Sequence, residues 1–588
     1  MAKNKNLLIF LLFSVLGFIL YMNTLKVGFV FDSVSLKYDP QIRDIFSALK
    51  DVFLQYSSNR RLAYFTFAIN YLIGRENPIG YHIFNIIIHI LTAFTVYKFL
   101  EIFTKKEKAS FFAALIFLVN PIQTQALNLI VQRMVLLSGL FYFLTLYLYL
   151  KNRETDKKRY YILAIISFLA GIRCKEIVIT LPLVLTFIDY KNIKKIIPFY
   201  FIAFLPILFK IMVALNGNNQ IGKVFNMKQA NADLTRGKYF ISEFKVIVYY
   251  IALILLPLKL RIDYDFKVDN SFFNIDVLFP FFILLVLIFL IIYLYKKKFL
   301  YSFSIFLFFM GIFVTSTIIP IEDLSFEHRV YISSVGVILF ITLFIDEIIK
   351  SKIIKNSIFI IILLIYSGLT INRNFEWKNE SKLWKTNIKY TPNKVRPRYN
   401  LVEVYLKEKK YNLALEEIDE ILKIDNYYEA YKDRAKIYLE TGDYNKALKS
   451  INIAISRYNK DIENYEIKIK IFEKLRKLDK IEETALKSLE IEKSAKMYNY
   501  LAEANYIRKN YNKAIKFANL GLEVKNNYRG NYLLGNISMK FSKYDKAINY
   551  FEQCVKIGRM DSKLYKRLKW LYQITGKKDK LKLGTLKK

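Results

Sequence analysis

Hydrophobic residues follow two different patterns in the two parts of the chain. Up to about residue 371, long apolar runs alternate with short clusters of Lys and Arg, whereas beyond residue 373 no apolar run exceeds a few residues. A helix needs about 20 mostly apolar residues to cross a bilayer. The pattern therefore predicts an all-α chain in which a polytopic membrane domain precedes a more polar helical tail.

Eleven apolar runs are candidates for membrane-spanning helices. The first, residues 7–21, follows two lysines as a signal peptide would. No small-residue cleavage site comes after it, so we expect it to remain as the first span. The other candidates are 82–103, 110–120, 134–150, 161–172, 176–190, 196–214, 275–295, 299–319, 330–348 and 353–371.

The basic clusters between these runs predict the orientation of the chain, because cytoplasmic loops are enriched in Lys and Arg. With a cytoplasmic N-terminus, every cluster lies on the cytoplasmic side. The tail then lies on the extracytoplasmic side, together with the loops 22–81, 120–133, 173–175, 215–274 and 320–329. Residues 246–256 are apolar enough to span, which would reverse the side of the tail. We expect them instead to lie on the outer face or to dip into it.

The tail repeats a short motif at a constant interval. Tyr-x-x-Ala occurs at Tyr411/Ala414, Tyr444/Ala447, Tyr511/Ala514 and Tyr544/Ala547, with a degenerate copy at Leu478/Ile481. Successive copies are 33 or 34 residues apart, which is the period of the tetratricopeptide repeat. We predict five repeats and a partial one from about Leu564, forming an α-solenoid. Its concave face either binds an extended peptide, or the solenoid is a spacer.

We therefore divide the chain into a transmembrane domain (1–372), a linker (373–395) and repeats (396–588). The amino-acid composition does not alter this division. The formal net charge is +39, but no nucleic-acid motif accompanies it. Enrichment in Lys, Ile, Asn, Tyr and Phe indicates AT-rich codon usage. We therefore expect no nucleic-acid partner and a bacterial cytoplasmic membrane as the location. The chain has only two cysteines, Cys174 and Cys554, and this low number excludes a disulfide scaffold.

Ionisable residues are concentrated in the outer loops, where such groups are costly and often functional. Cationic donors suited to phosphate are Arg60, Arg133, Lys175, His328 and Arg329. Carboxylates of interest are Asp32 and Glu327, which suit general-base catalysis, and Glu176 beside Lys175. Cations and a carboxylate at a membrane boundary favour a lipid-phosphate-linked substrate. The alternative is that these residues form helix caps and loop salt bridges.

Two of the three histidines share one face of a helix. His82, Asn85 and His89 stand at spacings of 3 and 4 residues. This face either contributes His82 to a substrate site or packs helices together through hydrogen bonds. The spacing of histidines and carboxylates forms no metal motif, so no cofactor is predicted and a divalent metal stays open.

The order of several outer-loop stretches, followed by the repeats, resembles the transmembrane and tetratricopeptide-repeat O-mannosyltransferases and their bacterial relatives. The matching stretches are 29–32, 60–70, 77–89, 120–133, 175–182, 239–265, 320–336 and 373–400. The resemblance implies a GT-C fold, in which Asp32 matches the catalytic base. Ser33 stands where that family often has a second acid. Asn120-Pro121 and Thr124-Gln125 replace its His-Pro and Thr-Glu, whereas Glu327-His328-Arg329-x-Tyr331 is intact.

The resemblance further implies an inverting glycosyltransferase that uses a polyprenyl-phosphate-linked sugar. The expected reaction transfers a hexose, such as mannose, to Ser or Thr of a protein or peptide that the repeats present on the extracytoplasmic face. The chain would also contact membrane lipid. Two alternatives stay open: the acceptor is a surface glycan or lipid, or the chain is a non-catalytic membrane-anchored repeat scaffold.

Overall fold

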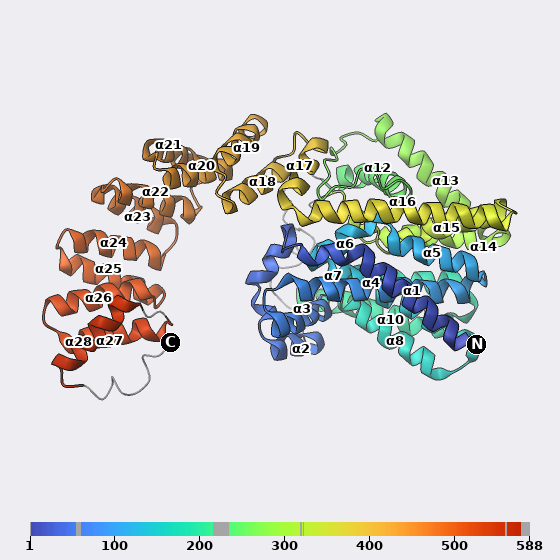
Figure 1. The fold of residues 1–588 in the computed structure, drawn as a ribbon, viewed down its shortest axis with the longest axis horizontal. Helices are drawn as coiled ribbons and strands as arrows, with labels where there is room; N and C mark the ends of the chain where they lie inside the picture. The colour runs from blue at the N-terminus through green and yellow to red at the C-terminus, as the bar shows by residue number, and fades with distance from the viewer. Residues whose placement is uncertain are drawn as a thin grey trace. The chain divides into compact units, whose positions relative to one another are not determined.

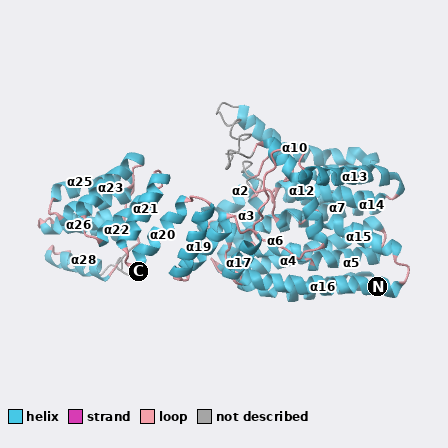
Figure 2. Cartoon of the chain, turned by 90° about the horizontal axis from the view of Figure 1, so that it is seen from above, coloured by secondary structure: helices cyan, strands magenta, loops and turns pink. Residues whose placement is uncertain are grey.

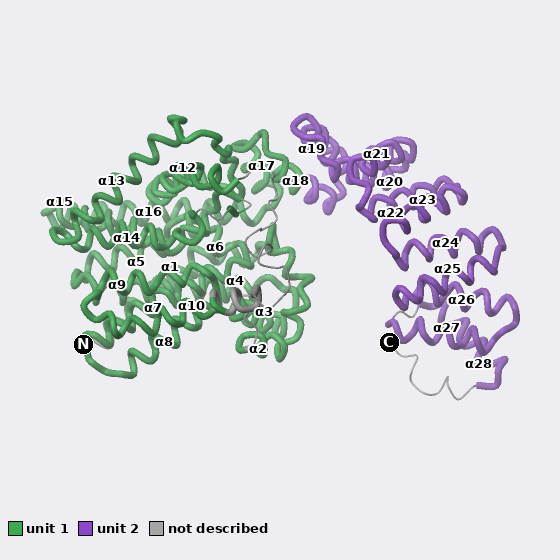
Figure 3. Tube along the Cα trace, turned by 180° about the vertical axis from the view of Figure 1, so that it is seen from behind, with its two compact units in different colours: residues 1–400 green, residues 401–588 purple. Residues whose placement is uncertain are grey.

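The computed structural model of the chain describes residues 2–54, 60–215, 235–317, 320–321, 323–558 and 561–577 (Figure 1). In these ranges all regular secondary structure is helical, which confirms the predicted fold class (Figure 2). The chain divides into two compact units, Met1–Asn400 and Leu401–Lys588 (Figure 3). The domain limits drawn from the sequence, at residues 372 and 395, stay predictions.

Each predicted apolar run coincides at least in part with a helix of the first unit. These helices are α1 Ala2–Tyr21, α4 Pro78–Thr104, α5 Glu107–Val119, α7 Arg133–Thr155, α8 Lys158–Ile172, α9 Leu181–Asp189, α10 Ile193–Leu215, α13 Ile275–Lys297, α14 Phe299–Ile312, α15 Ser334–Ile348 and α16 Lys352–Lys378. The part of the run 299–319 at residues 318–319 lies outside the described residues.

The loops between these helices contain further short helices. The α-helices are α2 Ile45–Leu54, α3 Arg61–Gly74, α6 Thr124–Asn128 and α12 Arg236–Leu255. The 3₁₀ helices are η1 Met22–Lys26, η2 Phe31–Tyr38, η3 Pro40–Ile42, η4 Pro121–Gln123, η5 Ile130–Gln132, η6 Glu176–Thr180, η7 Tyr190–Asn192 and η8 Glu327–Val330. α12 contains most of the apolar segment 246–256.

Five helical segments among the described residues are long and apolar enough to cross a membrane. They are Asn4–Lys26, Pro78–Thr104, Ile130–Thr155, Ile275–Lys297 and Lys352–Lys378. A sixth span results if Glu107–Val119 and Pro121–Asn128, which are bent by 48°, count as one. These helices identify a multi-pass membrane protein. The figure of eleven spans and the orientation stay predictions.

Asn-Pro dipeptides determine where two of these helices begin or bend. Asn77 precedes α4 and Asn120 precedes η4; each side-chain oxygen accepts a hydrogen bond from the N–H two residues on, at 3.1 Å. The proline that follows supplies no donor in the first turn, where none is needed. The Asn120 amide also donates to the Ile254 carbonyl at 3.1 Å. Asn120 is therefore a structural cap that joins the loop 120–133 to α12.

The centre of the first unit is α4, which packs against α1, α5 and α7 (Figure 1). Its inner face buries Ala93, Val96, Tyr97 and Phe99. The loops in which the candidate site residues lie connect the surrounding helices.

α14 and α15 cross closely at two glycines. A Cβ atom on Gly311 would lie 2.5 Å from Ser333 N, and one on Gly336 would lie 2.5 Å from the Ser304 carbonyl oxygen. Such approaches are closer than side chains tolerate, so this crossing requires glycine. The crossing fixes both ends of the segment between these helices, which contains residues 327–329.

The segment predicted as a linker is helical. Residues 373–378 complete α16, and α17 follows at Glu380–Tyr390 with Leu383, Trp384 and Asn387 buried. The first unit continues to Asn400. This segment therefore packs as part of the membrane unit.

In the described part of the tail, the structure has five helix pairs and one further helix. They are α18 Val395–Lys407 with α19 Tyr411–Ile424, α20 Tyr428–Thr441 with α21 Tyr444–Arg457, α22 Ile462–Lys474 with α23 Leu478–Ile491, α24 Ala495–Ile507 with α25 Tyr511–Val524, α26 Tyr528–Lys540 with α27 Tyr544–Lys556, and α28 Ser562–Ile574. Every motif Tyr, and Leu478, begins the second helix of its pair, and the residue three positions on is buried.

Candidate functional site

Asp32 lies on a loop that is tied to the bundle on both sides of it. Before it, the Val27 carbonyl accepts a hydrogen bond from His82 Nε2 at 2.9 Å. After it, Ser33 Oγ accepts one from the Val131 N–H at 3.3 Å. The Asp32 side chain is exposed in η2. The loop thus presents a carboxylate from a fixed backbone, and Ser33 is a buried anchor.

Phe31 brings the Asp32 loop against the fifth outer loop. The centroid of its ring lies 6.3 Å from that of Phe326 and 5.7 Å from that of Trp384 in α17. The Phe326 ring stacks in turn on the His328 imidazole, with centroids 5.2 Å apart. Segments far apart in the sequence therefore meet next to Asp32.

Arg60 and Lys175 lie together because the first and third outer loops are bonded to each other. The Leu62 N–H donates to the Arg173 carbonyl at 3.0 Å, at the start of α3. Arg60 Nε lies 3.5 Å from Glu176 Oε1, and these side chains are 44% and 38% exposed. The ion pair is therefore accessible from solvent.

Lys175 is a cation among other cations. Burial lowers the pKa of Lys175 to about 7, and the charges of Arg60 and Arg329 act in the same direction, while Glu176 opposes them. A group with this pKa is only partly charged near neutral pH. A phosphate bound beside it would favour the charged form.

His328 is neutral in these surroundings, whereas the sequence predicted a cation. Burial lowers the pKa of His328 well below its usual value, and Lys175, Arg329 and Arg60 act in the same direction. Gln125 Oε1 accepts hydrogen bonds from the His328 backbone N–H and from Nδ1, both at 2.9 Å. An amide oxygen only accepts, so Nδ1 carries the proton and Nε2 is left as an acceptor.

Arg329 is buried and held by backbone carbonyls. Nη1 donates to Leu324 O at 2.9 Å and Nη2 donates to Asp323 O at 2.7 Å. The charge of Arg329 also acts on Glu243 of α12. Burial raises the pKa of Glu243 to about 7, and the charge of Arg329 opposes that shift. The charges of Arg329 and Arg60 both act on Lys175, and all three act on His328, so we call Arg60, Lys175 and Arg329 the basic cluster.

Glu327 differs from Asp32 in being enclosed. Its side chain is 1% exposed, and Oε1 accepts hydrogen bonds from the Arg261 N–H and from the Tyr264 hydroxyl, the latter at 2.8 Å. Burial raises the pKa of Glu327 to about 7, against the charge of Arg373. Its contacts make it a structural link between two loops. In the described part of the chain, no three His, Cys, Asp or Glu side chains come together as a metal site.

The structure does not bring Arg133 to the basic cluster. Its guanidinium is completely buried; Nε donates to Asn85 Oδ1 at 2.8 Å, Nη1 to Thr66 O at 3.1 Å and Nη2 to Tyr81 O at 2.9 Å. It also lies 4.5 Å from the Phe67 ring centroid. Arg133 thus joins α3, α4 and α7.

The histidine face of α4 connects helices and loops. His82 holds the Asp32 loop at Val27, as described above. His89 bonds the Tyr331 hydroxyl through Nδ1 at 2.7 Å and the Leu118 carbonyl through Nε2 at 3.2 Å. This matches the interpretation of the face as a packing surface.

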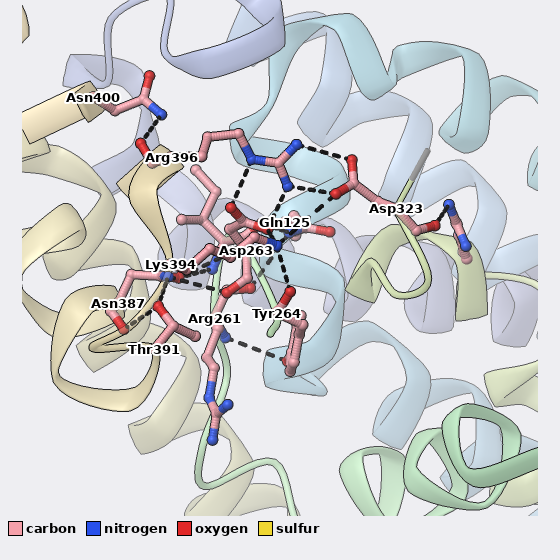
Figure 4. A network of polar contacts seen from close by, with 12 residues as sticks. Gln125, Arg261, Asp263, Tyr264, Asp323, Asn387, Thr391, Lys394, Arg396 and Asn400 are labelled. Carbon is pink, nitrogen blue, oxygen red and sulfur yellow. Dashed lines mark hydrogen bonds and ion pairs between the residues drawn. The ribbon is translucent and has the colours of Figure 1, made fainter. Parts of the chain in front are cut away.

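Residues that the sequence did not single out lie around the site. Lys394 and Arg396 bind Asp263 and Asp323 in a network that also contains Asn387 (Figure 4). In the sequence, these residues stand in the matching stretches 239–265, 320–336 and 373–400, with the two basic residues just before Pro397. Nothing in the sequence indicates which acids such a pair would meet.

Comparison with known proteins connects these features to named relatives. A tetratricopeptide-repeat family model matches residues 528–557. "Protein O-mannosyl-transferase F38B6.6" of Caenorhabditis elegans is 26% identical over 68% of this chain and 60% of its own length. "Protein O-mannosyl-transferase TMTC3" of Homo sapiens is 25% identical over 67% of this chain and 49% of its own length. The chain thus spans about half to three fifths of the length of these relatives.

Solved structures add no argument. The crystal structure of yeast Tom70 covers 82% of this chain and 96% of its own chain, but with 12% identity and a TM-score of only 0.30. Among the sequence relatives, a shorter match has a higher identity. "Protein O-mannosyl-transferase tmtc2" of Xenopus laevis is 34% identical over 25% of this chain and 19% of its own length. By sequence, this chain is similar to several proteins named protein O-mannosyl-transferases.

Proposed function

We propose that the chain is an integral-membrane glycosyltransferase that transfers a hexose from a polyprenyl phosphate to a hydroxyl of a protein. The observation that carries this proposal is the basic cluster, drawn from three outer loops, next to the loop of the exposed Asp32. Cations in this number suit a phosphodiester, and an exposed carboxylate suits proton removal. The titles of the relatives support hexose transfer to protein.

In the proposed reaction the donor enters from the membrane with its phosphate on Arg60, Lys175 and Arg329. Asp32 takes the proton of the acceptor hydroxyl, and the hydroxyl oxygen forms a bond to the anomeric carbon. The bond from that carbon to the phosphate oxygen breaks, and its electron pair leaves with the polyprenyl phosphate. The basic cluster stabilises this departing anion. Attack from the face opposite the phosphate inverts the anomeric configuration.

The other candidate residues support these groups. Glu176 orients Arg60, His82 holds the Asp32 loop, and Glu327 fixes the loop segment at Tyr264. His328 contributes a neutral hydrogen-bond acceptor, its Nε2 atom. Arg133 acts in folding rather than in phosphate binding, because its donors are already occupied.

The acceptor is a Ser or Thr of a protein on the extracytoplasmic face, brought there by the repeats. Glycoproteomics of the cell envelope tests this, comparing cells with the wild-type gene, without it and with Asp32→Asn. Loss of the same hexose-modified peptides in both altered strains is expected. Unchanged protein glycosylation with an altered surface glycan or lipid would refute the proposed acceptor. Protein and surface glycosylation that stay unchanged without the gene would refute the enzyme itself, whereas full rescue of the modified peptides by Asp32→Asn would refute Asp32 as the base.

Arg60→Ala is expected to raise the KM for the lipid-linked donor about tenfold, because it removes one exposed phosphate contact worth about 1.4 kcal/mol. Folding is unaffected, since the side chain is 44% exposed. Steady-state kinetics with a synthetic donor measures the change. Arg43→Ala, an exposed arginine of the same loop, is the matched control. An unchanged donor KM would remove Arg60 from the site.

The KM for the donor is expected to rise with pH above about 7, because the Lys175 ammonium loses its proton there when the site is empty. The rise approaches tenfold per pH unit once the neutral form dominates, since the donor phosphodiester does not change its own charge in this range. Lys175→Arg stays charged and is expected to abolish this part of the dependence. A pH profile that is identical in the two proteins would show that Lys175 does not bind the donor.

A further inference from the structure

Arg396, near the start of α18, bridges two acidic residues from different outer loops (Figure 4). Nε donates to Asp263 Oδ2 at 2.7 Å, Nη1 donates to Asp323 Oδ2 at 3.0 Å, and Nη2 bonds one oxygen of each carboxylate. The guanidinium therefore makes a bidentate ion pair with each of the two carboxylates at the same time. This requires the planar array of donors that arginine has and lysine lacks.

Lys394 completes the charge balance of this network. Its Nζ donates to Asp263 Oδ1 at 2.7 Å and to the Tyr264 carbonyl at 2.6 Å. The Asp263 side chain is only 1% exposed, so its charge is stable there only with close cations. Two acids and two bases together form a neutral, partly buried group, which we call the ionic clamp.

Each acid of the ionic clamp is directly connected to a residue of the proposed site. The Asp323 carbonyl accepts a hydrogen bond from Arg329 Nη2 at 2.7 Å. Asp263 precedes Tyr264, whose hydroxyl donates to Glu327 Oε1 at 2.8 Å. Arg396 thereby holds together the backbone segments on both sides of the basic cluster's Arg329.

The same segment of the chain also contacts the Asp32 loop. The Arg396 guanidinium lies 5.5 Å from the centroid of the Phe31 ring, one residue before Asp32. Asn387 of α17 adds backbone contacts, since its Oδ1 accepts from the N–H groups of Ile262 and Asp263, both at 3.0 Å. Residues 387–396 therefore meet three outer loops that the reaction uses.

We propose that Arg396 is a positioning residue for the transfer reaction, because its double ion pair to Asp263 and Asp323 fixes the loops that place Arg329 and Asp32. This inference rests on the proposed function. It assigns to the segment before the repeats a part in completing the site. Reacting groups that are displaced by about 1 Å lose on the order of 100-fold in rate, so the clamp acts on turnover without touching substrate.

Arg396→Lys in the full-length protein tests this proposal, because it keeps the charge and removes the second bidentate ion pair. The kcat with a synthetic polyprenyl-phosphate hexose is expected to fall about 10- to 100-fold. Hydrogen exchange of peptides covering 261–264 and 323–331 is expected to accelerate, with the repeats as an internal reference. Arg398→Lys is the matched control, since its Nε donates to the Pro392 carbonyl outside the clamp.

Four outcomes are distinguished by these measurements. Accelerated exchange with lowered kcat supports positioning, whereas accelerated exchange with normal kcat shows a merely structural clamp and overturns it. Unchanged exchange and unchanged kcat also overturn it. If the wild-type protein transfers no hexose, the proposed function fails, and the exchange comparison alone decides whether Arg396 holds the two segments.

Discussion

Asp32→Asn is expected to lower hexose transfer by about 1,000-fold while leaving the protein folded in the membrane. Asparagine has nearly the same shape but accepts no proton, and loss of a general base typically costs 10²- to 10⁴-fold in rate. The loop that presents the side chain depends on Val27 and Ser33, which the substitution leaves intact. Transfer by purified protein, measured as labelled hexose on an acceptor peptide, gives the rate.

Asp39→Asn provides the control for this experiment. Asp39 lies on the same loop and caps η3 by accepting from the Gln41 N–H at 2.9 Å. Asparagine caps a helix equally well, so both activity and stability should be preserved. Normal transfer by Asp32→Asn would assign the base to another residue, and a loss in both variants would indicate a general disturbance of the loop.

Arg133→Met is expected to lower the free energy of unfolding by about 3–5 kcal/mol, because three buried acceptors lose their donor at once. These acceptors are Asn85 Oδ1 and the carbonyls of Thr66 and Tyr81. The thermal unfolding midpoint of the detergent-solubilised protein measures the loss. Little protein in the membrane fraction is a second expected sign.

Lys151→Met on the same helix is the comparison for that experiment. Lys151 is 30% exposed and lies 2.8 Å from Glu154, which is 41% exposed, so its removal should shift the midpoint little. If Arg133 bound the donor phosphate instead, Arg133→Met would fold normally and show a raised donor KM. That result would return Arg133 to the basic cluster.

The helices could be predicted from the sequence because their signals are local. An apolar run of sufficient length indicates a helix whatever its neighbours are, and the Tyr-x-x-Ala interval indicates the first residue of each second repeat helix. The residues of the basic cluster, Arg60, Lys175 and Arg329, belong to the five cationic candidates identified in the sequence, and their role in binding phosphate stays a prediction. What could not be predicted was how far each side chain is enclosed.

Arg133 and His328 show why the burial of each side chain could not be predicted from the sequence. Both are basic residues in outer-loop stretches, like Arg60, and nothing nearby in the sequence distinguishes them. Arg133 is enclosed because α3 and α4 supply acceptors 48 to 67 residues away. His328 is neutral because it is buried among cations from other loops. These properties depend on contacts between distant segments, and so does the ionic clamp.

The anchors on both sides of Asp32 have a consequence for how substrates are handled. With Val27 and Ser33 bonded to the bundle, the conformational entropy of this loop is lost when the protein folds and not when substrates bind. In the proposed reaction, binding energy from the lipid chain of the donor and from the acceptor is therefore left to bring the hydroxyl and the anomeric carbon into line. In that reaction, the conformational entropy lost on binding is therefore that of the donor and the acceptor, and not that of the loop that carries Asp32.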